Sequence, residues 1–194
     1  KTTTAVNTAI SLAQTGANVL IIDADMRRPR LRSIFDLPDG EGLSSILSSE
    51  MKPQDMLNAI AKDPTTGLHV LTSGPIPPNP AELLGSDQMR KLIGVLSVPF
   101  THIVIDSPPV SSFTDGVLIA SMVDGVLLVV HGGKSSRGLV RRSRQLLLDV
   151  GAKLFGVVLN NVSIRSHDYY YYYQNYHQSY YTKDAETETR ASEA

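Results

Sequence analysis

The sequence contains no cysteine, so disulfide bonds, thiolate metal sites and cysteine-ligated iron–sulfur clusters are excluded. Acidic and basic residues nearly balance, 19 against 18, and the chain therefore has no overall charge that would draw it to nucleic acid or anionic lipid. No apolar run approaches the roughly 18 residues that cross a bilayer. The most apolar stretch, 117–130, is interrupted by Ser121, Asp124 and Gly125. This composition favours a cytoplasmic protein.

The N-terminus also lacks the charged-then-apolar layout of a signal peptide. The chain begins directly with Lys-Thr-Thr-Thr and without an initiator methionine, which predicts that it is part of a longer protein. Its 194 residues, 42% of them hydrophobic, suffice for one domain with a sizeable core.

Short apolar runs alternate with helical patterns over residues 1–162. Strands are predicted at 19–22, 103–105, 126–130 and 155–159, with a shorter candidate at 70–71; helices are predicted at 1–14, 43–47, 53–61, 81–96, 115–122 and 138–150. This alternation predicts an α/β fold with a mostly parallel sheet and helices on both faces. Ligands of such sheets lie at the carboxyl ends of the strands, where Asp23, Asp106 and His131 fall.

The alternating pattern stops after Val162, and residues 163–194 are predicted to be a flexible tail outside the packed domain. Thirteen residues of this tail include eight tyrosines: Tyr169, Tyr170, Tyr171, Tyr172, Tyr173, Tyr176, Tyr180 and Tyr181. Disordered segments are normally poor in aromatic residues, so this cluster indicates a function of its own.

Lys1, Thr2 and Thr3 open a predicted helix, as the last residues of a phosphate-binding loop do. In such a loop the backbone N–H groups and the helix N-terminus hold phosphates, the lysine neutralises them, and the next hydroxyl binds Mg²⁺. Taken alone, this short segment is a weak signal and is better explained as an ordinary capped helix start.

Two further segments place carboxylates directly after apolar strands. Asp23 and Asp25 follow the strand at 19–22, where they could share a hydrated Mg²⁺, or one could bind the metal while the other accepts a proton. Asp106 follows the strand at 103–105 and matches a Walker B aspartate, which holds Mg²⁺ through water. An exposed charged loop and an Asp-Ser-Pro-Pro turn are the alternative interpretations.

In this order, Lys1-Thr2, the Asp23–Arg27 segment and the Asp106–Pro109 segment resemble the Walker motifs of the bacterial tyrosine kinases of capsular and exopolysaccharide synthesis. Ser73–Leu84 resembles a further segment of that family, and the tyrosine cluster completes the match. The resemblance covers nearly the whole chain. It implies a deviant, MinD/ParA-like P-loop fold, truncated at its N-terminus so that the first strand and the glycines of the phosphate loop are missing.

The resemblance also implies roles for individual residues. Lys1 would contact the phosphates of ATP, Thr2 would coordinate Mg²⁺, and Thr3, Arg27 and Asn160 would lie on the nucleotide. Asp23 and Asp25 would serve the metal and the incoming tyrosine hydroxyl, with the choice of base left open, and Asp106 would support the metal shell. His131 stands where the family has arginine, and a structural role is expected for it.

Arg137, Arg141 and Arg144 recur on one face of the last predicted helix. A solvated surface is one interpretation. A contact with a neighbouring subunit, the phosphorylated tail or lipid headgroups is the other.

The expected function is therefore an ATP- and Mg²⁺-dependent tyrosine autokinase that phosphorylates its own tyrosine cluster in trans and regulates polysaccharide synthesis and export. The resemblance implies a homo-oligomer, with a ring expected, a membrane-spanning polysaccharide co-polymerase and a cognate tyrosine phosphatase as partners, and no nucleic acid. It implies a location at the cytoplasmic face of the plasma membrane. A MinD/ParA-like switch ATPase and a catalytically weak scaffold are the alternatives. The switch ATPase would not need the clustered tyrosines, and the retained Asp23, Asp25 and Asp106 argue against the scaffold.

Overall fold

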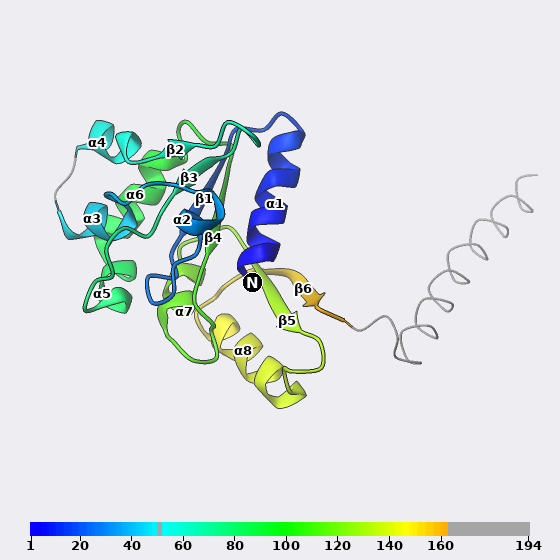
Figure 1. The fold of residues 1–194 in the computed structure, drawn as a ribbon. Helices are drawn as coiled ribbons and strands as arrows, with labels where there is room; N and C mark the ends of the chain where they lie inside the picture. Colours follow the sequence, from blue (N-terminus) through cyan, green and yellow to red (C-terminus); the bar gives the residue numbers. More distant parts are fainter. Residues whose placement is uncertain (50–51, 163–194) are drawn as a thin grey trace, which may run out of the picture.

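The computed structural model of the protein describes residues 1–49 and 52–162 (Figure 1). The predicted tail and its tyrosines lie outside the described residues. The described elements are α1 (Thr2–Gln14), β1 (Val19–Asp23), α2 (Leu31–Ile34), α3 (Leu43–Ser48), α4 (Pro53–Asn58), β2 (Ala61–Lys62), β3 (His69–Leu71), α5 (Pro80–Leu84), α6 (Asp87–Leu96), β4 (His102–Asp106), α7 (Asp115–Ala120), β5 (Val126–His131), α8 (Arg137–Asp149) and β6 (Leu154–Asn160).

β1 lies inside a four-stranded sheet with the order β2-β3-β1-β4. β3 and β4 run parallel to β1, and only the short β2 is antiparallel to its neighbour β3. Every residue of β1 is buried, because its side chains alternate between two apolar layers. The fold class predicted from the sequence is confirmed.

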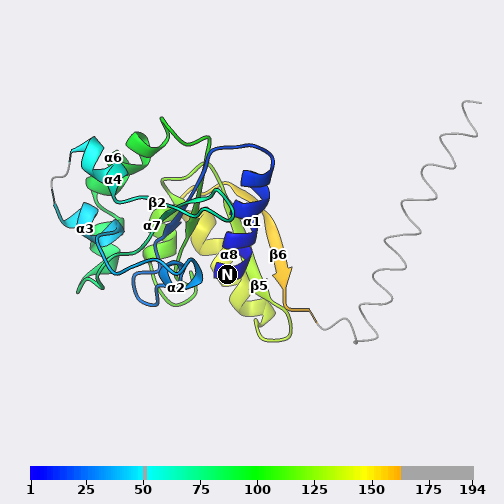
Figure 2. The same cartoon turned by 45° about the horizontal axis from the view of Figure 1, so that its top comes forward.

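Helices cover both faces of this sheet (Figures 1 and 2). Leu20 and Ile22 belong to the core formed with α3, α5 and α6, whereas Ile21 belongs to the core formed with α1 and Leu31. Consecutive residues of one strand thus support opposite layers, which explains why its sequence is apolar without interruption.

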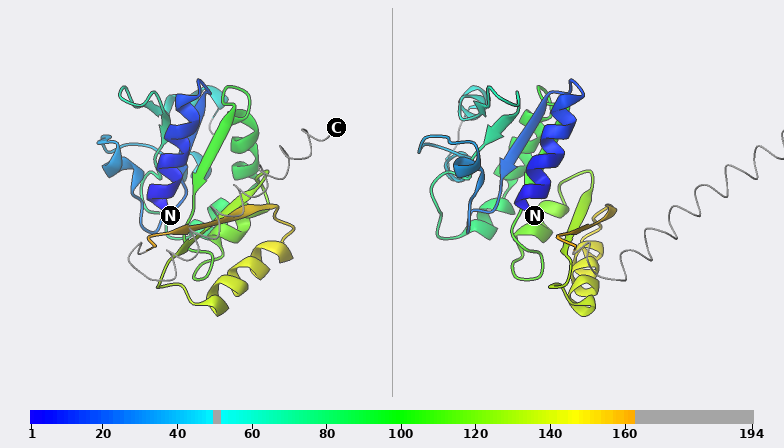
Figure 3. Two further views of the ribbon diagram at one scale, coloured as in Figure 1. Left: turned by 90° about the vertical axis from the view of Figure 1, so that its right-hand side faces the viewer. Right: turned by 45° about the vertical axis from the view of Figure 1, so that its right-hand side comes forward.

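β5 and β6 form a second, parallel sheet of two strands in the described part of the chain. α8 packs against it, with Leu147 and Ala152 buried beside Ala120 of α7. Figure 3 shows this pair of strands and α8 beside the four-stranded sheet. The sequence predicted one sheet, and the described residues form two.

Three local predictions are wrong. The helix expected at 81–96 is two helices, because Ser86 caps α6 by accepting the backbone N–H of Met89 at 3.3 Å. The helix expected at 53–61 ends at Asn58, and Ala61–Lys62 instead pairs with β3 as β2. The four-residue α2 was not predicted. No helix within 1–49 or 52–162 is long and apolar enough to cross a membrane.

Candidate active site

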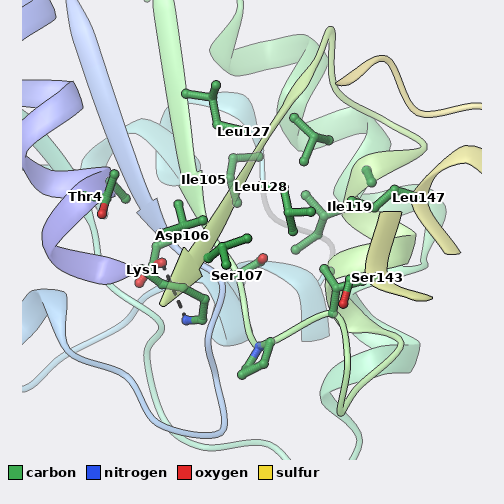
Figure 4. Close-up of a pocket in the computed structure, with 18 of the residues that line it drawn as sticks. Lys1, Thr4, Ile105, Asp106, Ser107, Ile119, Leu127, Leu128, Ser143 and Leu147 are labelled. Atoms are coloured by element: carbon green, nitrogen blue, oxygen red, sulfur yellow. Dashed lines mark ion pairs between the residues drawn. The ribbon is translucent and has the colours of Figure 1, made fainter. Parts of the chain in front are cut away.

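The carboxyl ends of β1 and β4 meet the N-terminus of α1. Asp23 and Asp106 end these two strands and are partners in the parallel register. Because α1 starts at the same end of the sheet, Lys1 and Thr2 lie beside the Asp106 carboxylate, and Figure 4 shows Lys1 next to Asp106. The structure therefore brings together the residues that the sequence placed in three separate motifs.

Lys1, Thr2 and Asp106 form one connected group. The Thr2 hydroxyl donates a 2.6 Å hydrogen bond to Oδ2 of Asp106. The Nζ of Lys1 lies 4.0 Å from Oδ1 of Asp106, the ion pair drawn in Figure 4. Burial raises the pKa of the Asp106 carboxyl, an effect that the Thr2 hydrogen bond and the Lys1 charge oppose.

Asp23 is fully buried, and both of its carboxylate oxygens accept backbone hydrogen bonds. Oδ2 accepts the N–H groups of Arg30 at 2.8 Å and Leu31 at 2.9 Å, and Oδ1 accepts that of Asp25 at 3.3 Å. Burial raises its pKa, and the hydrogen bonds from Leu31 and Arg30 work against that rise. These hydrogen bonds fix the path of the loop after β1 and the position of Leu31, the first residue of α2.

Asp25 has a different environment. Its Oδ1 accepts the backbone N–H of Arg28 at 3.1 Å, while its Oδ2 lies 3.7 Å from the Nζ of Lys1. The two carboxylates that the sequence could not tell apart are thus separated: Asp23 faces the backbone of its own loop, and Asp25 faces the Lys1 ammonium.

Arg27 is engaged away from Lys1. Its guanidinium donates two hydrogen bonds to Asp115, Nε to Oδ2 at 2.9 Å and Nη2 to Oδ1 at 3.1 Å, and lies 4.3 Å from the centre of the Phe113 ring. The pair joins the loop after β1 to the start of α7. Sequence reasoning missed Asp115, whose one signal was an acidic residue in the first turn of an apolar helix.

The remaining predicted residues lie in α1 and at the ends of β5 and β6. Thr3 is exposed. Asn160, the last residue of β6, donates its side-chain N–H to the Thr4 hydroxyl at 3.2 Å and so ties β6 to α1. His131 has the expected structural contacts, Nδ1 with the carbonyl of Gly132 at 2.8 Å and Nε2 with the side-chain amide of Asn161 at 2.9 Å.

A largely apolar cavity of about 650 Å³ separates β4 from β5. Ile105 and Leu128 line it from the two strands, and Lys1, Thr4 and Asp106 also line it (Figure 4). Within the described residues β4 pairs only with β1, and β5 pairs only with β6. Each of the two strands therefore has an unpaired edge, and the strand that the resemblance places before Lys1 stays a prediction.

The residues around Thr2 suit a magnesium ion bound together with phosphates. The described part of the chain has no group of three acidic or histidine side chains that could enclose a metal. Mg²⁺ is usually held by one or two carboxylates, with substrate phosphates and water completing its shell. The buried Asp106 carboxylate and the adjacent Thr2 hydroxyl fit that requirement.

Comparison with known proteins identifies the family. A family model described as an AAA domain matches residues 1–141. The tyrosine-protein kinase YwqD of Bacillus subtilis is 37% identical over 173 residues, which are 89% of this chain and 72% of YwqD. The tyrosine-protein kinase CpsD of Streptococcus agalactiae is 35% identical, over 84% of this chain and 70% of CpsD. The chain belongs to the bacterial tyrosine kinases.

Solved structures agree with this assignment. The chimerical protein CapA2B2 matches the kinase domain with a TM-score of 0.77 and 41% identity, over 84% of this chain and 70% of that one. The septum site-determining protein MinD of Pyrococcus horikoshii, solved with Mg-ADP, matches with a TM-score of 0.64 and 20% identity, over 80% of this chain and 62% of that one. The latter likeness concerns the fold alone. The recognition made from the motifs is confirmed.

Proposed function

We propose that this kinase domain transfers the γ-phosphate of ATP to tyrosine hydroxyls, including those of Tyr169–Tyr181, at the site built from Lys1, Thr2, Asp25 and Asp106. One observation carries the proposal. The Lys1 ammonium lies between the carboxylates of Asp25 and Asp106, 3.7 and 4.0 Å away, at the N-terminus of a 13-residue helix. Such an end attracts phosphate through its unpaired N–H groups and dipole.

Catalysis of phosphoryl transfer depends mainly on positioning the reactants and neutralising the charge of the phosphates, and little on covalent catalysis by the protein. Lys1 and the N-terminus of α1 supply positive charge for the phosphates. Thr2 and Asp106 are the residues that would hold Mg²⁺, an ion that neutralises phosphate charge when bound. The hydrogen bond between them holds the Thr2 hydroxyl oxygen and Oδ2 of Asp106 next to each other.

Asp25 is the residue best suited to accept the tyrosine proton. A tyrosine hydroxyl has a pKa near ~10 and is a weak nucleophile at neutral pH, so a nearby carboxylate lowers the barrier by taking the proton. Both oxygens of Asp23 already accept backbone N–H groups, and Oδ2 of Asp25 faces Lys1. We assign the base to Asp25 and a positioning role to Asp23.

The tyrosine segment is the proposed acceptor. It lies outside the described residues, and its sequence alone supports the assignment: eight hydroxyls in thirteen residues. Delivery in trans within a ring of subunits, regulation of capsule or exopolysaccharide export with a membrane-spanning co-polymerase, removal of the phosphates by a cognate phosphatase, and a place at the cytoplasmic face of the plasma membrane are parts of the same proposal.

The test incubates the parent protein, meaning the longer unsubstituted protein that contains this domain, with ATP and Mg²⁺. Peptide mass spectrometry then locates the phosphates on its own tyrosines. We expect several phosphates within 169–181, and a rate at least about 100-fold lower in Asp25→Asn, because a positioned base contributes that much or more. Asp124→Asn removes an exposed carboxylate elsewhere and serves as the control.

The alternatives predict other results. ATP hydrolysis with an unmodified tyrosine segment would overturn the kinase proposal and favour a switch ATPase. Neither hydrolysis nor transfer would favour a scaffold. Full activity in Asp25→Asn would remove Asp25 from the mechanism while leaving the kinase in place.

A further inference from the structure

α8 carries an unusual concentration of positive charge. Its 13 residues include four arginines and a single acidic residue, Asp149. That carboxylate accepts a 2.6 Å hydrogen bond from Gln145. Within the described residues, none of the four arginines forms an ion pair. The helix therefore presents basic charge that the described fold does not use.

Three of these arginines share one exposed face. Ser143 and Leu147 are buried and turn one side of α8 toward β5 and β6. Arg137, Arg141 and Arg144 are exposed and recur at i, i+4 and i+7, the spacing that aligns side chains along a helix. We call this set the arginine face. Its outer position leaves it free to meet an extended anionic segment.

The last described residues bring the chain to the loop before α8. The backbone N–H of Gly132 donates to the carbonyl of Asn160 at 2.7 Å, and the Asn161 amide meets His131 at 2.9 Å. The chain thus passes residue 162 beside the loop that leads into α8. Tyr169 follows Asn161 by eight positions, a span of up to about 26 Å at ~3.3 Å per residue. α8 itself is about 20 Å long.

Phosphorylation would change the charge of this segment completely. Residues 169–181 contain no aspartate, glutamate, lysine or arginine. Each phosphate would add roughly −1.5 to −2 charges and three strong acceptor oxygens. Arginine binds such groups through two parallel N–H···O bonds, and a row of arginines can hold several of them.

We propose that the arginine face of α8 is the docking surface for the phosphorylated Tyr169–Tyr181 segment of this protein. The unmodified segment has no charge with which to bind there. The inference rests on the proposed function, because it takes the kinase product as its ligand. Docking would keep a modified segment away from the active sites and leave unmodified segments free to enter them. An anionic membrane is the rival occupant, and the reach and charge change of the tyrosine segment favour the segment.

The test uses a synthetic peptide of residues 169–181, labelled with a fluorophore and phosphorylated at Tyr171, Tyr173 and Tyr176. Its binding to the unphosphorylated parent protein is followed by fluorescence anisotropy at about 0.15 M salt. Because the phosphates are added chemically, a failure of kinase activity leaves this measurement intact. We expect the unphosphorylated peptide to bind at least tenfold more weakly.

The decisive variant changes Arg137, Arg141 and Arg144 to glutamine together. We expect its affinity for the phosphopeptide to fall at least tenfold. The matched control changes three exposed cations on other elements, Lys62, Arg90 and Lys91, to glutamine, and should bind within about twofold of the parent. Circular dichroism checks that both variants are folded.

Two results would overturn the proposal. The first is equal binding of the phosphopeptide by the parent and the arginine variant. The second is that the arginine variant loses binding to vesicles that contain phosphatidylserine, while its affinity for the phosphopeptide equals that of the parent. That result would assign the arginine face to a membrane surface.

Discussion

At the end of β4 the Asp106 side chain is only 4% exposed, and burial raises its pKa. A folded-state pKa above the ordinary value of about 3.9 means that the folded chain binds the proton more readily than the unfolded chain. The resulting contribution to stability is fully present below the ordinary pKa. It is lost as the pH rises through the raised pKa, so at neutral pH the charged Asp106 opposes folding.

Replacement of Asp106 by asparagine should therefore stabilise the domain at pH 7. The amide is neutral and can still accept the Thr2 hydroxyl. We expect the free energy of unfolding to rise at pH 7, and the gain to shrink toward pH 4. Urea unfolding of both proteins from pH 4 to 7.5 measures this. A variant less stable than the parent at every pH would contradict it.

Motif order predicted that Lys1, Thr2, Asp25 and Asp106 are neighbours. Each lies at the start of a helix, at the end of a strand or just after one, at the same edge of the sheet. The distinction between Asp23 and Asp25 could not be predicted. It depends on backbone N–H groups seven and eight residues farther along, whose positions follow from the path of the loop.

The pairing of Arg27 with Asp115 could not be predicted from the sequence either. Asp115 is 88 positions away, and the contact exists because the fold brings the start of α7 against the loop after β1. Arg27 was expected on the nucleotide; in the structure its guanidinium is held by Asp115.

Among the elements, the start of α3 contacts the segment after β3 through main-chain atoms. The N–H of Leu43 donates to the carbonyl of Thr72, and that of Ser44 to the carbonyl of Ser73, both at 2.8 Å. A Cβ atom at Gly42 would lie 2.3 Å from the backbone nitrogen of Gly74. Only a residue without a side chain fits there, so α3 and the segment after β3 are held together by their main chains.

Gly42→Ala should consequently destabilise the domain by on the order of 3 kcal/mol, since backbone atoms must move to admit the methyl group. Gly40→Ala is the control, because no atom lies within 4 Å of the added Cβ, and its effect should stay within about 0.5 kcal/mol. Thermal and urea unfolding compare the two. Similar losses in both variants would show that the approach at Gly42 is relaxed at little cost.

Elements with strong periodic patterns were predicted well, and short ones were not. α8 and β5 follow from their own sequences, because apolar residues recur at helical spacing in α8 and form an unbroken run in β5. β2 has two residues and exists only because β3 lies beside it. The break between α5 and α6 depends on one serine cap, a local signal that the continuing apolar pattern concealed.

For the whole molecule, the sequence correctly predicted an α/β fold, but not that the strands of the described residues form two sheets. Alternating strands and helices indicate the layers, whereas strand order depends on contacts distant in sequence. The two parts are buried unequally. The four-stranded sheet has apolar cores on both faces, while β5 and β6 rest on a small core around Leu147.

This inequality predicts two levels of protection in native-state hydrogen exchange. Amides of β1 should exchange only through global unfolding, and amides of β5 and β6 through a cheaper local opening, because fewer buried contacts hold them. Mass-resolved exchange of peptides from the two regions, at increasing urea, measures the difference. Identical opening free energies would mean that the sheets unfold as one unit.

The unpaired edges that β4 and β5 have among the described residues bear on how residues 1–194, taken by themselves, behave in solution. An open edge is a template for a strand of another molecule, and alternate residues of β6 add the exposed apolar side chains Phe155, Val157 and Leu159. Residues 1–194 would thus have two routes to self-association, subunit assembly through folded surfaces and edge-to-edge β pairing. Edge-to-edge β pairing gives a cross-β infrared band and thioflavin fluorescence, and the resulting assemblies have no fixed number of subunits. Light scattering alone would count both as oligomers, so an amyloid-sensitive dye belongs beside it in any study of assembly.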